Sequence, residues 1–289
     1  MKRVTRRDVL ASLGVVGGTS LLAGCDVQSE TFPREEGAEW QFAGSGRRPQ
    51  SQNWVWVELD QGLVAKKAYE LFPHGGCMYG ITGSIVTTLS EIVGEPYRSF
   101  PFQMMQYGAG GTGGWGTICG ALNGAAAVIG LVHAKHSDRM QAKQETPAGP
   151  RPLEAFSWYR LIEEVFRWYE TAELPKYREE ESANPSKVPP SVSGSVLCHV
   201  SLSNWSNQSG HKPFTPQMKE RCRRLTADVA RKTVDVLNRD LKGECFSGGL
   251  APEVKSCIAC HGKQDRADSI GKMSCTACHK LPNDHPEGR

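Results

Sequence analysis

The chain has 289 residues, 39% of them hydrophobic, which is enough for one large domain or two small ones with a real core. Its formal net charge of +3 arises within the first 24 residues, and the remainder carries 30 basic and 30 acidic side chains. This balance excludes the strongly basic surface that nucleic-acid binding requires. No internal run of 18 or more apolar residues predicts a membrane span.

Residues 1–24 are typical of an export signal. Thr5-Arg6-Arg7-Asp8-Val9-Leu10 matches the twin-arginine pattern, and an apolar, glycine-rich stretch follows it. The stretch ends in Leu22-Ala23-Gly24-Cys25, which resembles a bacterial lipobox. We therefore predict export to the periplasm by the twin-arginine route, with a lipid on Cys25 that anchors the protein to the membrane surface. The alternative is an ordinary cleaved signal in which Cys25 has no role.

Residues 25–58 lack any hydrophobic period and are predicted to be a tether or surface segment. Within it, Trp54-Val55-Trp56-Val57 could be a short strand or a patch laid on the core. Apolar residues at helical spacing then predict a helix over about 60–72, a break at Pro73-His74-Gly75-Gly76 and a second helix over about 77–93.

A glycine-dense loop at 108–116 follows, without the Lys-Ser/Thr of a phosphate-binding loop. Further helices are predicted from Cys119 to about His136, over 153–172, and from Thr215-Pro216 to about Asp240. Irregular connections separate them at 138–152 and 183–195. The fold class is therefore mainly α: a helical domain over 59–245, followed by an irregular C-terminal segment over 246–289.

That C-terminal segment contains two Cys-x-x-Cys-His motifs, Cys257-Ile258-Ala259-Cys260-His261 and Cys275-Thr276-Ala277-Cys278-His279. Two thiols at this spacing attach the two vinyl groups of one haem, and the adjacent histidine becomes the proximal iron ligand. The sequence thus predicts two covalently attached haems c, with His261 and His279 as proximal ligands. A zinc ribbon or two disulfides would also use four cysteines, but neither requires a histidine after each pair.

Four more cysteines lie in the helical region: Cys77, Cys119, Cys198 and Cys222. Cys77 and Cys119 are predicted at helix N-termini after glycine-rich turns, where thiolates are favoured. Twin-arginine export carries proteins that fold around a cofactor in the cytoplasm, whereas haem c is attached after export, so a second cofactor is expected. A four-thiolate iron–sulfur site is our hypothesis; buried free thiols or two disulfides are the alternatives. Cys245 has no assigned partner.

Three stretches resemble the redox-active C_GCAxxG_C_C family: Gly76-Cys77-Met78-Tyr79-Gly80, the run from Gly110 to Ala125 through Cys119, and the run from Glu220 to Val229 through Cys222. With two haem motifs added, the chain is similar to the split-Soret cytochromes c of sulfate-reducing bacteria over about residues 60–280. The resemblance implies a mostly helical homodimer with four bis-histidine haems gathered at one end. It also implies an iron–sulfur site, with the four cysteines of the helical region as its ligands.

The distal haem ligands are less constrained. A helix that begins at Cys119 carries His133 and His136 about 25 Å away from a cluster at its N-terminus, so we predict one of them as a distal ligand, reached within the chain or across a dimer. The expected function is electron transfer between redox partner proteins. A haem-based reductase of a small oxidant and a zinc-ribbon interaction protein are the alternatives.

Overall fold

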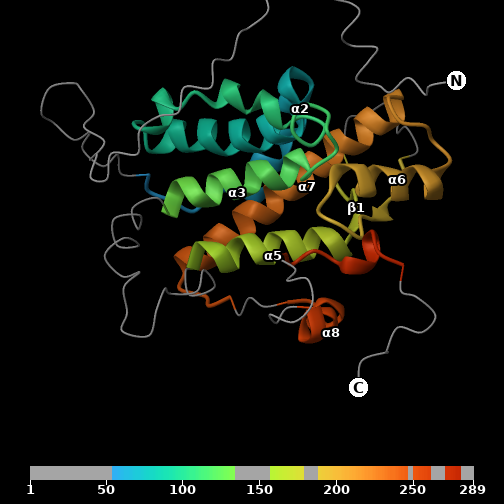
Figure 1. Cartoon of the computed structure of the whole chain (residues 1–289). Coiled ribbons are helices and arrows are strands. Elements are labelled where there is room, and N and C mark those ends of the chain that lie inside the picture. Colours follow the sequence, from blue (N-terminus) through green and yellow to red (C-terminus); the bar gives the residue numbers. More distant parts are fainter. Residues whose placement is uncertain (1–53, 134–156, 179–187, 247–249, 262–270, 281–289) are drawn as a thin grey trace, which may run out of the picture. The chain divides into compact units, whose positions relative to one another are not determined.

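The structure is a computed structural model that describes residues 54–133, 157–178, 188–246, 250–261 and 271–280. Helices dominate these residues, as Figure 1 shows, and the mainly α fold class is confirmed. None of the described helices is both long enough and apolar enough to span a membrane. The predicted signal, Cys25 and His136 lie outside the described residues.

The first helical element, α2 (Gln61–Ile92), is interrupted at Gly76, where φ is +81° and ψ is −166°. This left-handed φ suits glycine because it has no Cβ. The element then doubles back on itself: Lys67 Nζ lies 2.8 Å from the carboxylate of Glu91, whereas a straight helix would separate the two residues by about 36 Å. The predicted pair of helices with a break before Cys77 is therefore confirmed.

Three further helices complete the core: α3 (Gly120–His133), α5 (Ser157–Thr171) and α7 (Pro216–Leu241). Each falls within a predicted helix. Figure 1 shows α3 between α2 and α5, with α7 passing behind α3 and α5. Their apolar faces meet in one core cluster that includes Ile85, Leu122, Val165 and Val229.

The N-terminus of α7 follows the pattern read from the sequence. Thr215 is its N-cap, and the Thr215 hydroxyl accepts a hydrogen bond from the Met218 amide at 3.3 Å. Pro216 occupies the first turn, where its missing N–H costs nothing.

Smaller elements connect the helices. They are the 3₁₀ helices η1 (Tyr97–Ser99) and η2 (Phe102–Gly108), the antiparallel strand pair β1 (Glu173–Leu174) and β2 (Ser191–Val192), and the helix α6 (Cys198–Ser209). The sequence left the structure at residue 198 open, and α6 begins there.

The C-terminal segment is less irregular than predicted. The first Cys-x-x-Cys-His motif lies on a ten-residue helix, α8 (Pro252–His261), and the second begins with a 3₁₀ turn, η5 (Cys275–Ala277). Apolar periodicity missed α8 because only Val254 of this helix is buried, at 1% exposure.

Of the two interpretations of Trp54–Val57, the structure has the patch laid on the core. Trp56 Nε1 donates to Asn238 Oδ1 at 3.2 Å, and the Tyr97 hydroxyl donates to the Val55 carbonyl at 2.9 Å. Asn238 also holds the next peptide, since its amide donates to the Leu59 carbonyl and its oxygen accepts the Leu59 N–H. These hydrogen bonds fasten the start of the described chain to α7.

Candidate functional site

Four cysteines from four separate segments meet inside the helical domain. Cys77 follows the kink of α2, Cys119 immediately precedes α3, Cys198 begins α6, and Cys222 lies near the start of α7. The thiols of Cys77 and Cys222 are hydrogen-bonded to each other, and the charges of Cys119 and Cys222 act on Cys198. The structure thus brings together the four cysteines that the sequence singled out, and all four are free thiols.

Two of these cysteines are positioned by a short backbone ladder. Ile118 and Leu197 form an antiparallel bridge. Beside it, the Cys119 amide donates to the Val196 carbonyl at 2.8 Å, and the Cys198 amide donates to the Thr117 carbonyl at 2.7 Å. Because α3 and α6 both start at this ladder, their first turns are held side by side.

Glycines allow the segments that carry the thiols to approach closely. A Cβ on Gly111 would lie 2.9 Å from the Cβ of Cys198. A Cβ on Gly120 would lie 2.4 Å from the carbonyl oxygen of Gly108 and 3.3 Å from the Cβ of Cys77. The glycine-dense loop therefore brings backbone close to the cysteines, in the manner expected from its composition.

Burial and hydrogen bonding separate the pKa values of the four thiols. The hydrogen bond from Cys77, followed by the charge of Arg221, lowers the pKa of Cys222 to about 6. The same hydrogen bond and burial raise the pKa of Cys77 well above its usual value. Burial raises the pKa of Cys119, and it raises that of Cys198 to about 12. The pair Cys77–Cys222 therefore shares one proton near neutral pH, with Cys222 as the thiolate.

A buried polar network borders the thiols. Arg221 is 2% exposed, and its Nη2 donates to Ser201 Oγ at 2.8 Å. The Tyr169 hydroxyl also donates to Ser201 Oγ, at 3.0 Å. Tyr169 has a pKa raised well above its usual value, first by burial and then by the charge of Cys119. Arg221 and Tyr169 therefore connect α7, α6 and α5 around the cysteines.

The sequence reasoning gave Arg221 no role. A signal for Arg221 was present, however. It precedes Leu225 by four residues and Val229 by eight, so it lies on the face of α7 that enters the core. A charged residue on an apolar helix face requires an explanation, and proximity to Cys222 supplies one.

The donor chemistry of this site fits an iron–sulfur centre. Thiolate sulfur is the ligand that iron–sulfur clusters use, and a buried arginine complements the negative charge of several thiolates. Within the described residues, no three His, Cys, Asp or Glu side chains are already arranged to hold a metal ion.

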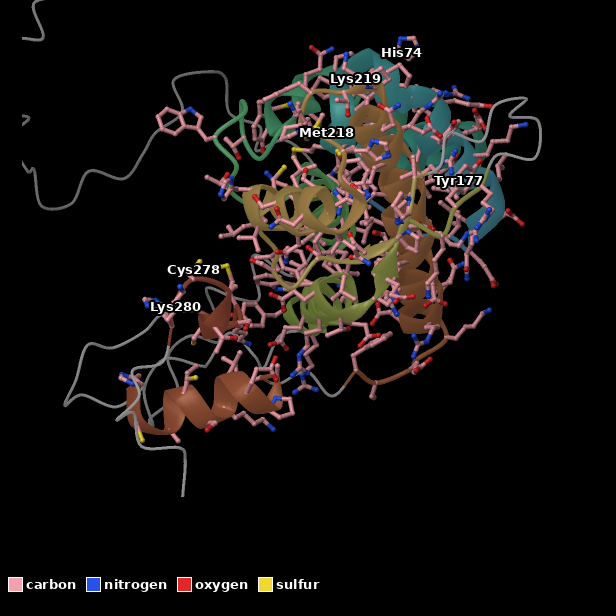
Figure 2. All side chains as sticks on the ribbon, turned by 90° about the vertical axis from the view of Figure 1, so that its right-hand side faces the viewer. His74, Tyr177, Met218, Lys219, Cys278 and Lys280 are labelled. Carbon is pink, nitrogen blue, oxygen red and sulfur yellow. The ribbon has the colours of Figure 1, made fainter. Side chains whose placement is uncertain are left out.

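The two haem-type motifs lie next to each other in the C-terminal segment. Burial and a hydrogen bond with Cys257 raise the pKa of Cys275, which places the first cysteines of the two motifs in contact. Cys260 and Cys278 are exposed, and Figure 2 shows Cys278 with Lys280 on the outside of the molecule. In the second motif the His279 amide donates to the Cys275 carbonyl at 2.9 Å, so this motif forms a single helical turn.

Helix α5 connects the thiol cluster with this segment. Tyr169 faces the cysteines, and the next residue, Glu170, lines the same cavity as Ser274. Earlier in α5, Glu163 pairs with Lys272. Because Ser274 precedes the second motif, α5 holds that motif beside the end of the helix that also carries Tyr169.

His133 lies at the other end of α3 from Cys119. Its Nε2 is 3.4 Å from the carboxylate of Asp240, near the C-terminus of α7. Within one chain, His133 and Ser274 therefore approach opposite ends of the α3–α5 pair. The assignment of His133 as a distal haem ligand stays a prediction.

Four clustered thiols, two of them buried and one with a lowered pKa, define the class of protein: a cysteine-based redox protein. Comparison with known proteins agrees. Residues 82–236 match the family model described as putative redox-active protein (C_GCAxxG_C_C). The chain is 34% identical, over 96% of its length and 94% of the relative, to the split-Soret cytochrome c of Desulfovibrio desulfuricans.

A solved structure of the D. desulfuricans protein, described as containing a novel iron centre, is also similar. It aligns with a TM-score of 0.67 and 32% identity, over 80% of this chain and 92% of that one. The chain belongs to the C_GCAxxG_C_C family and, within it, to the split-Soret cytochrome c group. Its role is accordingly in redox chemistry.

Proposed function

We propose that the chain is an exported electron-transfer protein with two covalently attached haems on its C-terminal segment and an iron–sulfur centre in its helical domain. The observation that carries the proposal is the meeting of Cys77, Cys119, Cys198 and Cys222 in one site, in a chain that also contains two Cys-x-x-Cys-His motifs. The haem and iron centre reported for the relative support it.

On α8, the residues Cys257, Cys260 and His261 are spaced i, i+3 and i+4, so they lie on one face of the helix. Each thiol can add across one vinyl group of a haem, and the histidine then falls on the iron. The haem supplies one-electron chemistry at its iron. Cys275, Cys278 and His279 do the same on the turn that begins with η5.

Two features of the segment favour neighbouring haems. The contact between Cys257 and Cys275 supports neighbouring attachment sites. An open cavity of about 600 Å³ lies next to Ser274, lined by residues that include Trp168, Val192 and Pro252. A cavity of this size and partly apolar lining suits a flat cofactor attached at the adjacent cysteine.

In the helical domain, the four thiols hold the iron and the surrounding core excludes water from it. Cys77 and Cys119 are both buried, at 9% and 3% exposure. Low solvent exposure and hydrogen bonds to sulfur set the potential of such a centre. Electrons would pass one at a time between this centre and the haems, along the connection that α5 makes.

The domain organisation and location belong to the same proposal. Residues 1–24 direct export by the twin-arginine route, Cys25 anchors the protein to the periplasmic membrane surface, and 25–58 form the tether. The helical domain over 59–245 folds around its centre before export, and 246–289 receive haem afterwards. The protein acts as a homodimer, and its partners are other redox proteins.

The test is analysis of the full-length protein purified from the periplasm of a haem-attaching host. We expect two haems per chain by pyridine haemochrome, together with iron and acid-labile sulfide beyond the haem iron. Cys257→Ala should lower the number of normally attached haems from two per chain to one. Cys119→Ala should remove the sulfide while leaving both haems. Cys245→Ala is the matched control, because this exposed thiol belongs to neither set. Absence of covalent haem, or zinc in its place, would overturn the proposal.

The distal ligands are tested by the spectra of the ferric haems. Low-spin signals in the wild type that become high-spin in His133→Ala or His136→Ala identify the ligand. High-spin haem in the wild type that binds CO rapidly would favour the reductase alternative instead.

A further inference from the structure

Arg221 is a buried cation whose hydrogen bonds are incomplete. Its side chain is 2% exposed, its Nη2 donates to Ser201, and its guanidinium also interacts with the sulfur of Cys222. The Nε–H group is buried and has no hydrogen-bond partner among the described residues. The face of Trp205 lies 5.8 Å from the guanidinium carbon, which adds a weak attraction without accepting a hydrogen bond from Nε.

The charge of Arg221 is also unpaired by any carboxylate among the described residues. Its neighbour Arg224 provides the contrast: it is 8% exposed, and its Nε donates to the Glu220 carboxylate at 2.6 Å. Burying a charge without a counter-charge costs several kcal/mol or more, so native proteins pair or neutralise such groups. Arginine cannot lose its proton, and a negative partner is therefore required.

The cysteines are the groups placed to supply that negative charge. Cys222 is the next residue on α7, and Cys119 and Cys198 are within electrostatic range of Arg221. Ser201 and Tyr169, the other polar groups in the network, are neutral hydroxyls. The site is thus complete only when it holds negative charge on sulfur.

We propose that Arg221 is the positioning residue of the four-cysteine site, where its unpartnered Nε–H donates to sulfur of the bound centre and its fixed charge offsets one of the negative charges there. This inference rests on the proposed iron–sulfur centre. Reduction adds one electron from the reductant to that centre and moves no proton. The added charge lies beside a cation, so Arg221 stabilises the reduced form more than the oxidised form and raises the midpoint potential.

One substitution should have different effects in two states of the protein. In iron-free full-length protein, Arg221→Met removes a buried charge that has no carboxylate partner among the described residues and only the Cys222 sulfur as counter-charge, so the melting temperature should change little. After loading with ferrous iron and sulfide, the same variant should gain less melting temperature from the centre than the wild type gains. Its midpoint potential, followed by EPR during titration with dithionite, should shift to a more negative value.

Two further variants separate charge from geometry. Arg221→Lys keeps the charge and loses the planar fork, so its potential should lie between those of the wild type and Arg221→Met. Arg224→Met is the matched control on the same helix. It removes a buried arginine that has its own carboxylate, so it should lower stability in both states and leave the potential unchanged.

An Arg221→Met protein that loads normally and keeps the wild-type potential would overturn the inference and leave the proposed function standing. Loss of iron from Arg221→Met, in a chain that melts normally without iron, supports it. A wild-type chain that takes up no iron and no sulfide would overturn the proposed function and this inference with it.

Discussion

Replacing Gly120 by alanine should force the start of α3, next to Cys119, away from the end of η2 at Gly108. The new Cβ would lie 2.4 Å from the Gly108 carbonyl oxygen, whereas ordinary contacts of a Cβ are 3.4–4 Å. The obstructing group is backbone, so the two segments must separate by about 1 Å, against tight native packing. Overpacking of this kind costs typically 1–3 kcal/mol, and a backbone obstacle places Gly120→Ala at about 3 kcal/mol. The helix propensity of alanine returns about 1 kcal/mol, which leaves a net loss of about 2 kcal/mol.

The same helix provides the control. A Cβ on Gly130 would meet nothing within 4 Å, so Gly130→Ala should stabilise the protein by about 1 kcal/mol through helix propensity alone. Urea unfolding of the two variants in iron-free protein should therefore differ by about 3 kcal/mol in the free energy of unfolding. Gly120→Ala should also bind less iron and sulfide, because the shift of α3 displaces Cys119 from the other cysteines. Equal stabilisation by both substitutions would refute the close approach of η2 and α3 at this point.

Three further outcomes are expected. In the iron-free protein, the rate of Cys222 alkylation, measured by mass spectrometry, should rise with pH with a midpoint near 6. At pH 7 such a thiol is about 90% thiolate, against about 1% for a thiol of pKa 9. A midpoint at 9 would contradict the lowered pKa of Cys222. Glu170→Gln should make the stability of the protein less dependent on pH. Burial and then the Glu253 charge raise the Glu170 pKa above its ordinary value of 4.5. The contribution of Glu170 to stability is therefore complete at low pH and is lost as the pH rises through the pKa of the folded state. The urea midpoint of the variant should exceed that of the wild type at pH 7 and match it at pH 4, and parallel curves would contradict this. Asn238→Ala removes three hydrogen bonds to Trp56 and Leu59 and should lower the free energy of unfolding by about 3 kcal/mol. A decrease below about 1 kcal/mol, measured by urea unfolding, would show that water replaces the side-chain amide.

The haem attachment that we propose for the C-terminal segment could be predicted from the sequence because it depends on local groups. Two thiols and a histidine within five residues present the groups that haem attachment needs, whatever the rest of the chain does. The main helices were predictable for a similar reason. Apolar residues repeat with helical period along α5 and α7, a run of small and apolar residues forms α3, and Thr215-Pro216 marks where α7 begins. The helix α8 escaped this reasoning because it buries a single apolar side chain.

Finding the cysteine site required both the sequence and the tertiary structure. Its four residues could be nominated from the sequence, and two could be placed at helix starts, but 145 positions separate Cys77 from Cys222. Only tertiary structure decides that these two thiols share a hydrogen bond. The fold at Gly76, the ladder at Ile118 and Leu197, and the close approach at Gly120 produce that meeting, and each depends on partners distant in sequence.

Arg221 shows most clearly which features the sequence determined and which the tertiary structure decided. The sequence alone determined that an arginine precedes Cys222 on the inward face of a helix. Tertiary packing decided that Glu220 pairs with Arg224 and leaves Arg221 with Ser201 and sulfur. A helical period fixes which face a residue occupies, since that depends on its neighbours in the chain. Which charges remain unpaired inside a protein depends on every segment that packs there, and so the need for an anion at this site became visible only in the folded structure.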